Sequence, residues 1–239
     1  MNKNFKFQED DFFGESTLKA ISSADKFNAW MYDQLKPYIN GRVLEIGSGI
    51  GNISKFLVNQ HDQVTLSDIR DGYVNKLKKE FKKANVLEIN LTDKDFDVKY
   101  KKLFGTFDFI FALNVIEHIE DDKLAMANIH KLLNKGGLVF ILVPAYQVLY
   151  NHFDIALEHY RRYNERSLKE IFSNYKLIKS YYFNFMGIFG WFLVGKILGR
   201  KVIPESNMKA YNFFVPIFKL IDKILINKIG LSVIQVAKK

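Results

Sequence analysis

Several features that define whole classes of protein are missing from this sequence. There is no cysteine, which excludes disulfides, thiolate metal sites, iron–sulfur clusters and a cysteine nucleophile. Residues 1–7 contain no apolar core of a signal peptide, so we expect none and place the protein in the cytoplasm. The uncharged, aromatic-rich run 181–195 is shorter than the ~20 residues that a membrane-spanning helix needs.

Composition and charge indicate a globular protein with an excess of positive charge. The 239 residues are 48% hydrophobic and 26% charged, which suits one large α/β domain with its own core. The net charge of +9 favours anionic partners, such as nucleic acid, a membrane surface or a phosphorylated substrate. A merely lysine-rich composition gives the same value, so charge alone does not choose among these partners.

Apolar runs alternate with amphipathic stretches between residues 42 and 144. Five runs rich in Val, Ile, Leu and Phe are predicted to be buried strands: Arg42–Ile46, Gln63–Ser67, Asn85–Asn90, Phe107–Leu113 and Leu138–Pro144. Three amphipathic stretches are predicted to be helices: Gly51–Asn59, Gly72–Lys83 and Asp121–Leu133. This alternation predicts a parallel sheet with helices on both faces.

Both ends of the chain add elements to this core. A helical stretch is expected at Leu18–Ile39, before the first strand. After the fifth strand we expect a helix, a strand and an amphipathic segment, at Ser167–Tyr175, Leu177–Phe183 and Tyr211–Ile226. The last run, Leu231–Ala237, directly follows Gly230 and leaves no room for a crossover helix, so we expect an antiparallel strand.

The loop after the first predicted strand carries three alternating glycines, Gly47, Gly49 and Gly51. Glycine allows a tight turn and lets the backbone approach a ligand without interference from a Cβ atom. A ligand there lies at the carboxyl edge of the sheet, beside a helix N-terminus. The glycine pattern alone is shared with dinucleotide-binding folds.

Two carboxylates distinguish this loop from a dinucleotide site. Glu45 stands two residues before Gly47, where it would repel a pyrophosphate but attract a cofactor with sulfonium and ammonium groups. Asp68 ends the second predicted strand, where a carboxylate accepts the hydroxyls of a ribose. The sequence therefore predicts a nucleoside cofactor that carries positive charge.

These residues resemble the first motif of class I S-adenosylmethionine (SAM)-dependent methyltransferases, and the similarity covers most of the chain. Asn90-Leu91-Thr92-Asp93 resembles the end of the third strand, where the family surrounds the adenine, although many members have Asp at the position of Asn90. Phe107–Ile119 resembles the fourth strand and its loop, and Leu133–Gly137 the turn into the fifth. The resemblance implies a doubly wound, Rossmann-like α/β sheet of seven mostly parallel strands in the order 3-2-1-4-5-7-6.

The resemblance further implies one domain over residues 1–239 that binds SAM and releases S-adenosylhomocysteine. Within it we expect an N-terminal helical cap (1–40), a SAM-binding core (41–145), and substrate or lid insertions at 145–166 and 184–230. The predicted cofactor-binding residues are Glu45, Gly47, Ser48, Gly49, Gly51, Asn52, Asp68, Asn90, Leu91 and Asn114.

Two histidines are candidates for a catalytic base. His118 follows Glu117 in the loop after the fourth strand, and His159 lies beyond the fifth. An imidazole that titrates near neutrality suits removal of a proton from a hydroxyl group. A structural role for His118 is the alternative. The Glu-His pair resembles that of methyltransferases acting on small molecules, and we predict O-methylation of a small-molecule, sugar or lipid-linked acceptor.

A cluster of tyrosines and arginines follows the fifth strand. Two adjacent arginines amid tyrosines could clamp a phosphate or carboxylate, so we predict that substrate is bound by Tyr146, Tyr150, Tyr160, Arg161 and Arg162. The alternative is an ion-pair network with Asp154, Glu158 and Glu165. The run resembles bacterial and archaeal methyltransferases of cell-surface polysaccharide or lipid-linked sugar pathways. We expect no metal, because the nearby histidines and acids lack helix-face spacing.

The apolar segment Tyr181–Ile203 has two interpretations. We favour a lid over the substrate pocket, while the aromatic residues beside Lys196, Arg200 and Lys201 also suit contact with a membrane surface. Among other functions, nucleic-acid methylation is disfavoured because Asn114-Val115-Ile116-Glu117 lacks the N-P-P-Y pattern of exocyclic-amine enzymes. A SAM-binding protein without catalysis stays open, because binding and turnover are separable.

Overall fold

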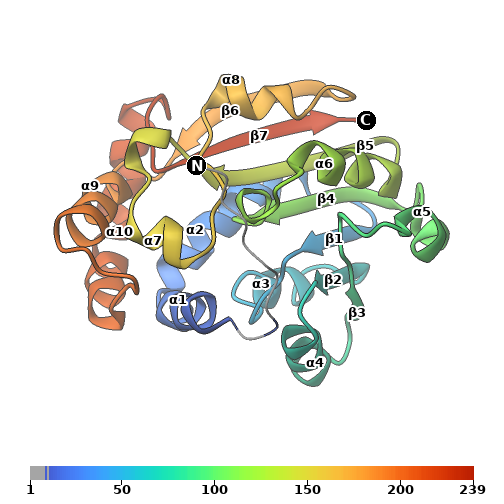
Figure 1. Cartoon of the computed structure of the whole chain (residues 1–239), viewed down its shortest axis with the longest axis horizontal. Helices are drawn as coiled ribbons and strands as arrows, with labels where there is room; N and C mark the ends of the chain where they lie inside the picture. The colour runs from blue at the N-terminus through green and yellow to red at the C-terminus, as the bar shows by residue number, and fades with distance from the viewer. Residues whose placement is uncertain (1–8, 10) are drawn as a thin grey trace.

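The computed structural model describes residue 9 and residues 11–239. Residues 1–7, on which the expectation of no signal peptide rests, and part of the predicted cap 1–40 lie outside these residues. Figure 1 shows one central sheet with helices packed on both sides of it.

The sheet has seven strands in the order β3-β2-β1-β4-β5-β7-β6, which confirms the predicted order. β7 pairs antiparallel with both β5 and β6, as its short connection requires, and the pairs among the other described strands are parallel. The strands are β1 (Val43–Ile46), β2 (Val64–Asp68), β3 (Asn85–Glu88), β4 (Phe107–Leu113), β5 (Leu133–Pro144), β6 (Lys176–Phe183) and β7 (Ser232–Lys238).

Helices bury both faces of the sheet, which explains why the central strands are apolar on successive residues. One face is covered by α2 (Asp25–Leu35), α3 (Ser54–Val58), α4 (Asp71–Glu80) and α10 (Glu205–Ile224). The other is covered by α5 (Phe96–Lys99), α6 (Asp122–Leu132) and α8 (Glu165–Glu170). Strand β4 alternates between them: Phe109 and Phe111 face the first layer, and Ile110 and Ala112 the second.

Short elements complete the connections. They are α1 (Phe12–Ser22), α7 (His152–Ala156), α9 (Gly187–Trp191), the π-helical turn η5 (Phe192–Ile197), and the 3-10 turns η1 (Lys36–Tyr38), η2 (Lys101–Leu103), η3 (Ile116–His118) and η4 (Gln147–Leu149). Asn151 caps α7 and Asn164 caps α8, each through its side-chain oxygen. No helix in the described part of the chain is long and apolar enough to cross a membrane.

The helix boundaries differ from the sequence prediction at four places. Leu18–Ile39 is broken at Ser23 and Ala24 into α1 and α2, because Ser23 ends α1 and Ala24, with a non-helical ψ of 65°, is the N-cap of α2. The predicted helices Gly51–Asn59 and Ser167–Tyr175 shorten to α3 and α8, and the segment at Tyr211 starts six residues earlier, as α10. The predicted strand Leu138–Pro144 begins five residues earlier, because β5 already starts at Leu133 and includes the predicted turn Leu133–Gly137.

Candidate active site

A cavity of about 1,100 Å³ opens along the carboxyl ends of the parallel strands. Single ligand pockets usually measure ~300–1,000 Å³, so this one has room for a cofactor and a second molecule. All predicted cofactor-binding residues but Gly51 line it: Glu45, Gly47, Ser48, Gly49, Asn52, Asp68, Asn90, Leu91 and Asn114. Among the other predicted residues, His118, His159, Tyr160 and Arg162 line it as well.

The glycine loop takes a backbone path that only glycine adopts without strain. Gly47 has φ +71°, and a Cβ atom there would lie 2.4 Å from Cγ2 of Val115. Gly51 has φ +84°, and its Cβ would lie 2.5 Å from the Phe81 ring, which explains why this glycine turns the chain into α3 without lining the cavity. The loop therefore presents bare backbone to the cavity, as a closely approached ligand requires.

Glu45 is a buried carboxyl group at the start of this loop. Its Oε2 accepts a hydrogen bond from Ser54 Oγ at 2.6 Å, and its side chain is 4% exposed. Burial raises its pKa to about 7, against the lowering effect of hydrogen bonds from Ser54 and Ser48. A buried acid that reaches the cavity and ionises near neutrality is suited to compensate a positively charged ligand.

Asp68 ends β2 and fastens it to the glycine loop. Its Oδ2 accepts the N–H of Gly49 at 2.9 Å, and its Oδ1 accepts the N–H of Arg70 at 3.0 Å. Burial nevertheless raises its pKa. Ile69 also donates a backbone hydrogen bond to Asp68. A carboxylate has about four lone-pair positions, so it can still accept from a donor in the cavity, such as a ribose hydroxyl.

Two asparagines, Asn90 and Asn114, line the cavity at the ends of β3 and β4. The Asn90 side-chain oxygen accepts the N–H of Thr92 at 2.9 Å, which forms the turn after β3 beside Leu91. Asn114 follows β4 with φ +54°, a conformation that asparagine tolerates better than most residues. Asn52 binds α1 to the loop, because its Nδ2 donates to the Leu18 carbonyl at 2.9 Å.

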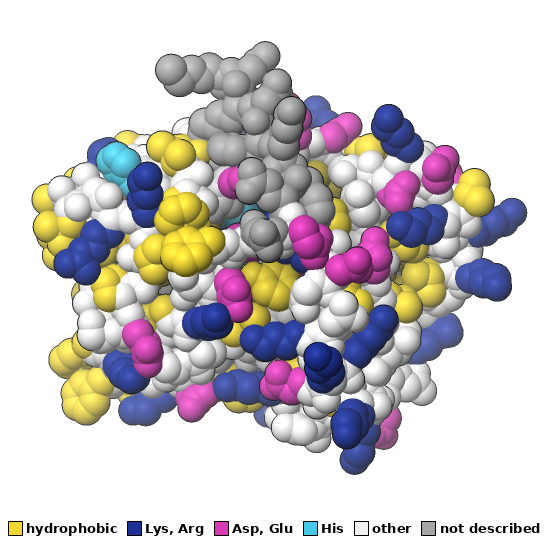
Figure 2. Space-filling model, turned by 60° about the horizontal axis from the view of Figure 1, so that its bottom comes forward, with side chains coloured by type: hydrophobic (Ala, Val, Ile, Leu, Met, Phe, Trp, Pro, Cys, Tyr) yellow, Lys and Arg dark blue, Asp and Glu magenta, His cyan; other side chains and the backbone are white. Residues whose placement is uncertain are grey.

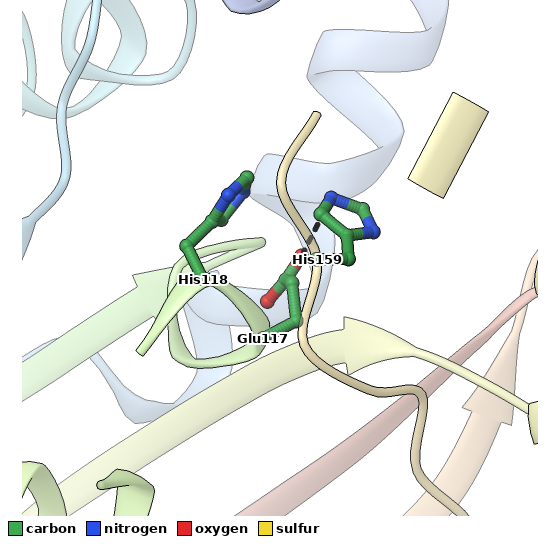
Figure 3. A group of neighbouring side chains, drawn as sticks. All are labelled: Glu117, His118 and His159. Carbon is green, nitrogen blue, oxygen red and sulfur yellow. Dashed lines mark ion pairs between the residues drawn. The ribbon is translucent and has the colours of Figure 1, made fainter. Parts of the chain in front are cut away.

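A group of acid and base side chains lies at the other end of the cavity, with Glu117 and His159 buried and His118 exposed to the cavity. Figure 3 shows the carboxyl group of Glu117 between the rings of His118 and His159. Glu117 is fully buried, and neither of its oxygens has a hydrogen-bond partner among the described residues. Burial raises its pKa to about 8, so it is mostly protonated at neutral pH. Its Oε1 lies 4.0 Å from Nε2 of His159.

His159 is held rigidly from behind. Its Nδ1 lies 2.9 Å from Oδ1 of Asp154, a carboxylate that also accepts Nε of Arg162 at 2.8 Å. Asp154 is buried, yet the hydrogen bonds from His159 and Arg162 outweigh that burial and lower its pKa. Tyr150 Oη donates to the His159 carbonyl at 2.7 Å. This arrangement fixes the ring and leaves its Nε2 on the side of Glu117.

His118 faces the cavity directly. Its side chain is exposed to the cavity. Desolvation by the surrounding protein and the positive charge of the adjacent His159 lower the pKa of His118 well below its ordinary value. The two rings meet edge to face with centroids 4.6 Å apart. A hydrogen bond to the backbone of Leu157 holds one ring nitrogen. His118 is therefore neutral near pH 7, with the other nitrogen able to accept a proton.

The tyrosine and arginine cluster divides into cavity and support residues. Arg162 is 5% exposed, donates to Asp154 and to the Ala145 carbonyl, and stacks 4.7 Å above the Trp191 ring. Arg161 pairs with Asp122 at 2.6 Å and does not line the cavity. Tyr146 and Tyr150 also lie outside its lining. The ion-pair alternative thus has partners in the structure, although they are Asp154 and Asp122 rather than Glu158 or Glu165.

Glu117, His118 and His159 are also a group that could hold a metal ion. Each offers one ligand atom, and these three atoms lie within 4.8 Å of one another. Asp154 behind His159 would serve as the outer carboxylate that often orients a ligating imidazole. The sequence prediction of no metal rested on the absence of helix-face spacing, whereas these three side chains come from two loops that the fold brings together. It stays a prediction that metal addition and removal can test.

Three residues that line the cavity, Asn184, Trp191 and Tyr211, were not among the predicted site residues. Trp191 of α9 lines it, and its indole N–H is buried without a hydrogen-bond partner among the described residues. Asn184 has φ +68°, and its side-chain oxygen accepts the Tyr211 hydroxyl. The only sequence signal for them was their place in an aromatic-rich segment, which does not distinguish a wall residue from a core residue.

The parallel sheet with an antiparallel β7 and the glycine loop at the end of β1 define a class I methyltransferase fold. The family model described as a methyltransferase domain matches residues 24–177, more than half of the chain. The chain therefore belongs to this methyltransferase family. The prediction from the sequence that it is a SAM-dependent methyltransferase, with SAM as its cofactor, is confirmed.

Similar proteins extend this finding without naming an acceptor. A highly reducing polyketide synthase of Gibberella fujikuroi is 26% identical over 146 residues, which are 57% of this chain and 6% of the synthase. The chain thus spans only a small part of such relatives. A SAM-dependent methyltransferase of Archaeoglobus fulgidus shares the fold with TM-score 0.57, 17% identity and coverage of 89% and 94% of the two chains.

A third similar structure is phosphoethanolamine N-methyltransferase 2 of Haemonchus contortus in complex with SAM. It has TM-score 0.62 and 16% identity, and the match covers 98% of this chain and 60% of that chain. At these identities the solved structures show the fold alone.

Proposed function

We propose that this chain transfers the methyl group of SAM to a small, largely apolar acceptor that bears a hydroxyl group, with His118 as the base. The observation that carries the proposal is one continuous cavity. It runs from the glycine loop and Asp68 to His118 and His159. SAM, when bound, supplies an electrophilic sulfonium methyl group, and the residues beyond it have to align and deprotonate the acceptor.

The cofactor end fits SAM in shape and charge. The glycine loop follows a positive-φ path without side chains at Gly47 and Gly49, Asp68 keeps acceptor positions for a ribose, and Glu45 is the buried acid that would neutralise a sulfonium or ammonium group. Asn90 and Leu91 then border the adenine, and Asn114 borders the methionine moiety. We propose these roles for the cofactor-binding residues predicted from the sequence.

The base assignment rests on protonation. A neutral imidazole accepts a proton, and the lowered pKa of His118 keeps it neutral. Glu117, whose pKa is about 8, stays mostly protonated beside His159 and adds no negative charge at neutral pH. General-base catalysis of this kind contributes ~10²–10⁴-fold to rate. We assign His159 a positioning role: Asp154 fixes its ring, and the ring in turn orients Glu117 and His118.

The acceptor end of the cavity is apolar. Its walls include Phe153, Phe183, Trp191, Val194 and Tyr211. An apolar wall favours a lipid-like, acyl or aromatic acceptor over a bare sugar or a nucleic acid. The relationship to segments of polyketide synthases supports a small-molecule acceptor of this kind.

The test measures S-adenosylhomocysteine formation from SAM with a panel of phenols, long-chain alcohols, lipid-linked sugars and RNA. We expect turnover with apolar hydroxyl compounds. His118→Gln should lower kcat by ~100-fold or more while SAM affinity stays unchanged. His130→Gln, a half-buried histidine on α6 that does not line the cavity, is the matched control.

Three results would contradict the proposal. Turnover with RNA alone would favour the nucleic-acid alternative, and SAM binding without turnover on any acceptor would favour a non-catalytic role. Loss of turnover on chelation, restored by a divalent cation, would transfer the role of His118 from base to ligand.

A further inference from the structure

The C-terminal helices expose an unusual amount of apolar surface. Large hydrophobic side chains on α9, η5 and α10 and in the turns after them are 41–72% exposed, namely Phe189, Phe192, Leu193, Ile197, Leu198, Phe213, Phe214, Ile217, Leu220, Ile224, Ile226 and Ile229. We call these residues the apolar face. Figure 2 shows hydrophobic side chains with Lys and Arg among them along the left edge, the side on which Figure 1 places α9 and α10.

On α10 the exposed residues follow the helix period. Phe213, Ile217, Leu220 and Ile224 are spaced by four, three and four residues and therefore form one stripe. Met208, Val215 and Asp222 are the buried residues of the same helix. Apolar side chains therefore lie on both sides of α10: Val215 packs against the core, and the stripe points away from it.

The same segment also forms the wall of the cavity. Gly187, Trp191, Val194, Met208 and Tyr211 line the cavity from α9, η5 and α10. The inner side of these helices agrees with the lid interpretation of Tyr181–Ile203, and their outer side is left for a second contact. Apolar patches of this extent on a protein surface mark sites of interaction.

Charge selects the partner. Residues 185–230 contain seven basic residues, Lys196, Arg200, Lys201, Lys209, Lys219, Lys223 and Lys228, and only two acidic ones. Asp222 is 3% exposed and accepts the N–H groups of Asn184 and Phe185, and Glu205 pairs with Lys209 at 2.7 Å. Lys219 pairs with Asp33 of α2 at 2.9 Å. Lys196, Arg200, Lys201, Lys223 and Lys228 still give the apolar face a net positive charge, which suits an acidic lipid surface.

We propose that α9, η5 and α10 dock the protein on an anionic lipid bilayer, with the apolar face in the interface and the basic residues among the headgroups. No described helix is long and apolar enough to span the bilayer, so the contact is with its surface. Docking would bring the cavity wall formed by Trp191 and Val194 close to the lipid. The proposal concerns binding and holds whether or not the methylated atom is oxygen.

The test is flotation of the full chain with vesicles of phosphatidylcholine alone and of phosphatidylcholine with phosphatidylglycerol. Binding should be stronger on the anionic vesicles by about fivefold per engaged basic residue and should weaken with salt. The double variant Phe213→Ser with Ile217→Ser should lower binding at least tenfold. Both side chains are exposed and outside the cavity, so SAM affinity should be unchanged.

Two further variants secure the interpretation. Arg200→Gln with Lys201→Gln removes charge only and should lower binding to anionic vesicles while leaving binding to neutral ones unchanged. Val98→Ser, on α5 and 81% exposed, is the apolar control outside the face and should bind normally. Figure 1 places α5 at the opposite end of the molecule.

Two results would overturn the proposal. One is absence of flotation with the anionic vesicles. The other is a dimer in light scattering that Phe213→Ser with Ile217→Ser dissociates while vesicle binding stays absent, which would assign the apolar face to a second copy of this chain.

Discussion

Three buried carboxyl groups, Glu45, Asp68 and Glu117, show how burial gives one residue type different roles. Glu45 and Asp68 line the cavity beside the glycine loop, whereas Glu117 lies next to His159, with neither oxygen in a hydrogen bond among the described residues. Burial raises the pKa of all three. Asp68 alone is fixed by two backbone N–H groups of neighbouring loops.

Asp68→Ala should weaken SAM binding by ~1.5–3 kcal/mol, the range for hydrogen bonds to a charged group. The change removes the proposed ribose acceptor and also releases the N–H of Gly49. Isothermal titration calorimetry measures the affinity, with Asp62→Ala at the exposed turn before β2 as the control. Unchanged affinity in a folded variant would remove Asp68 from the ribose site.

SAM affinity should rise with pH between about 6 and 8. Glu45 has a pKa near 7 in the ligand-free protein, and a cationic ligand favours its ionised form, so binding lowers this pKa and releases a proton. The affinity therefore increases as the free protein loses that proton. Calorimetry in buffers of different ionisation enthalpy measures proton release, which Glu45→Gln should abolish. Equal proton release from Glu45→Gln and the native protein would assign the effect to another group.

The two adjacent arginines should differ in their effect on stability. Arg162→Ala leaves Asp154 buried beside His159 alone, and breaking a buried pair costs ~3–5 kcal/mol. Arg161→Ala breaks a more exposed pair with Asp122, worth ~1 kcal/mol or less. Urea denaturation gives both free energies of unfolding. Equal small losses, together with a raised KM for an anionic acceptor in Arg162→Ala, would restore the clamp interpretation.

Among single residues, more of the predicted cofactor-binding residues than of the predicted substrate-binding residues line the cavity. Glu45, Gly47 and Asp68 could be predicted to lie together because strand ends and glycine spacing are local signals. Arg161 was predicted to bind substrate, but it pairs with Asp122, which lies 39 residues earlier and is brought near only by the fold.

Among the elements, α1 is the one whose role emerged only from the structure. It lies over the glycine loop. The Leu18 side chain packs so close to Gly49 that a Cβ atom there would lie 2.9 Å from it, and the Leu18 carbonyl accepts a hydrogen bond from the Asn52 amide. The sequence indicated helix here but not the break at Ser23 and Ala24 that separates α1 from the core helix α2. Helical periodicity continues through that break, and no proline or glycine marks it.

Asn52→Ala should loosen α1 without unfolding the sheet. It removes one neutral hydrogen bond, worth ~1 kcal/mol, and so raises the local opening of α1 about fivefold. Amide hydrogen exchange measures this opening, and bound SAM should suppress it because α1 lines the cavity. Unchanged exchange in α1, or faster exchange in the central strands, would show that α1 is held by other contacts.

For the whole molecule, strand order and the direction of β7 were predicted correctly, because short βαβ connections and the resemblance to a known family fix them together. The outward apolar stripe of α10 could not be predicted. Its sequence alone does not show which face packs against the core, and only the structure shows that Met208 and Val215 face inward. One cavity is lined by the glycine loop, by His118 and His159, and by residues of α9, η5 and α10.

A crystal structure with S-adenosylhomocysteine bound tests this account most directly. We predict that the ribose hydroxyls lie within hydrogen-bonding distance of the Asp68 carboxylate, that the amino group lies toward Glu45, and that the sulfur faces the part of the cavity lined by His118. Density for the product with its sulfur turned away from His118, or with its ribose distant from Asp68, would contradict the proposed active site.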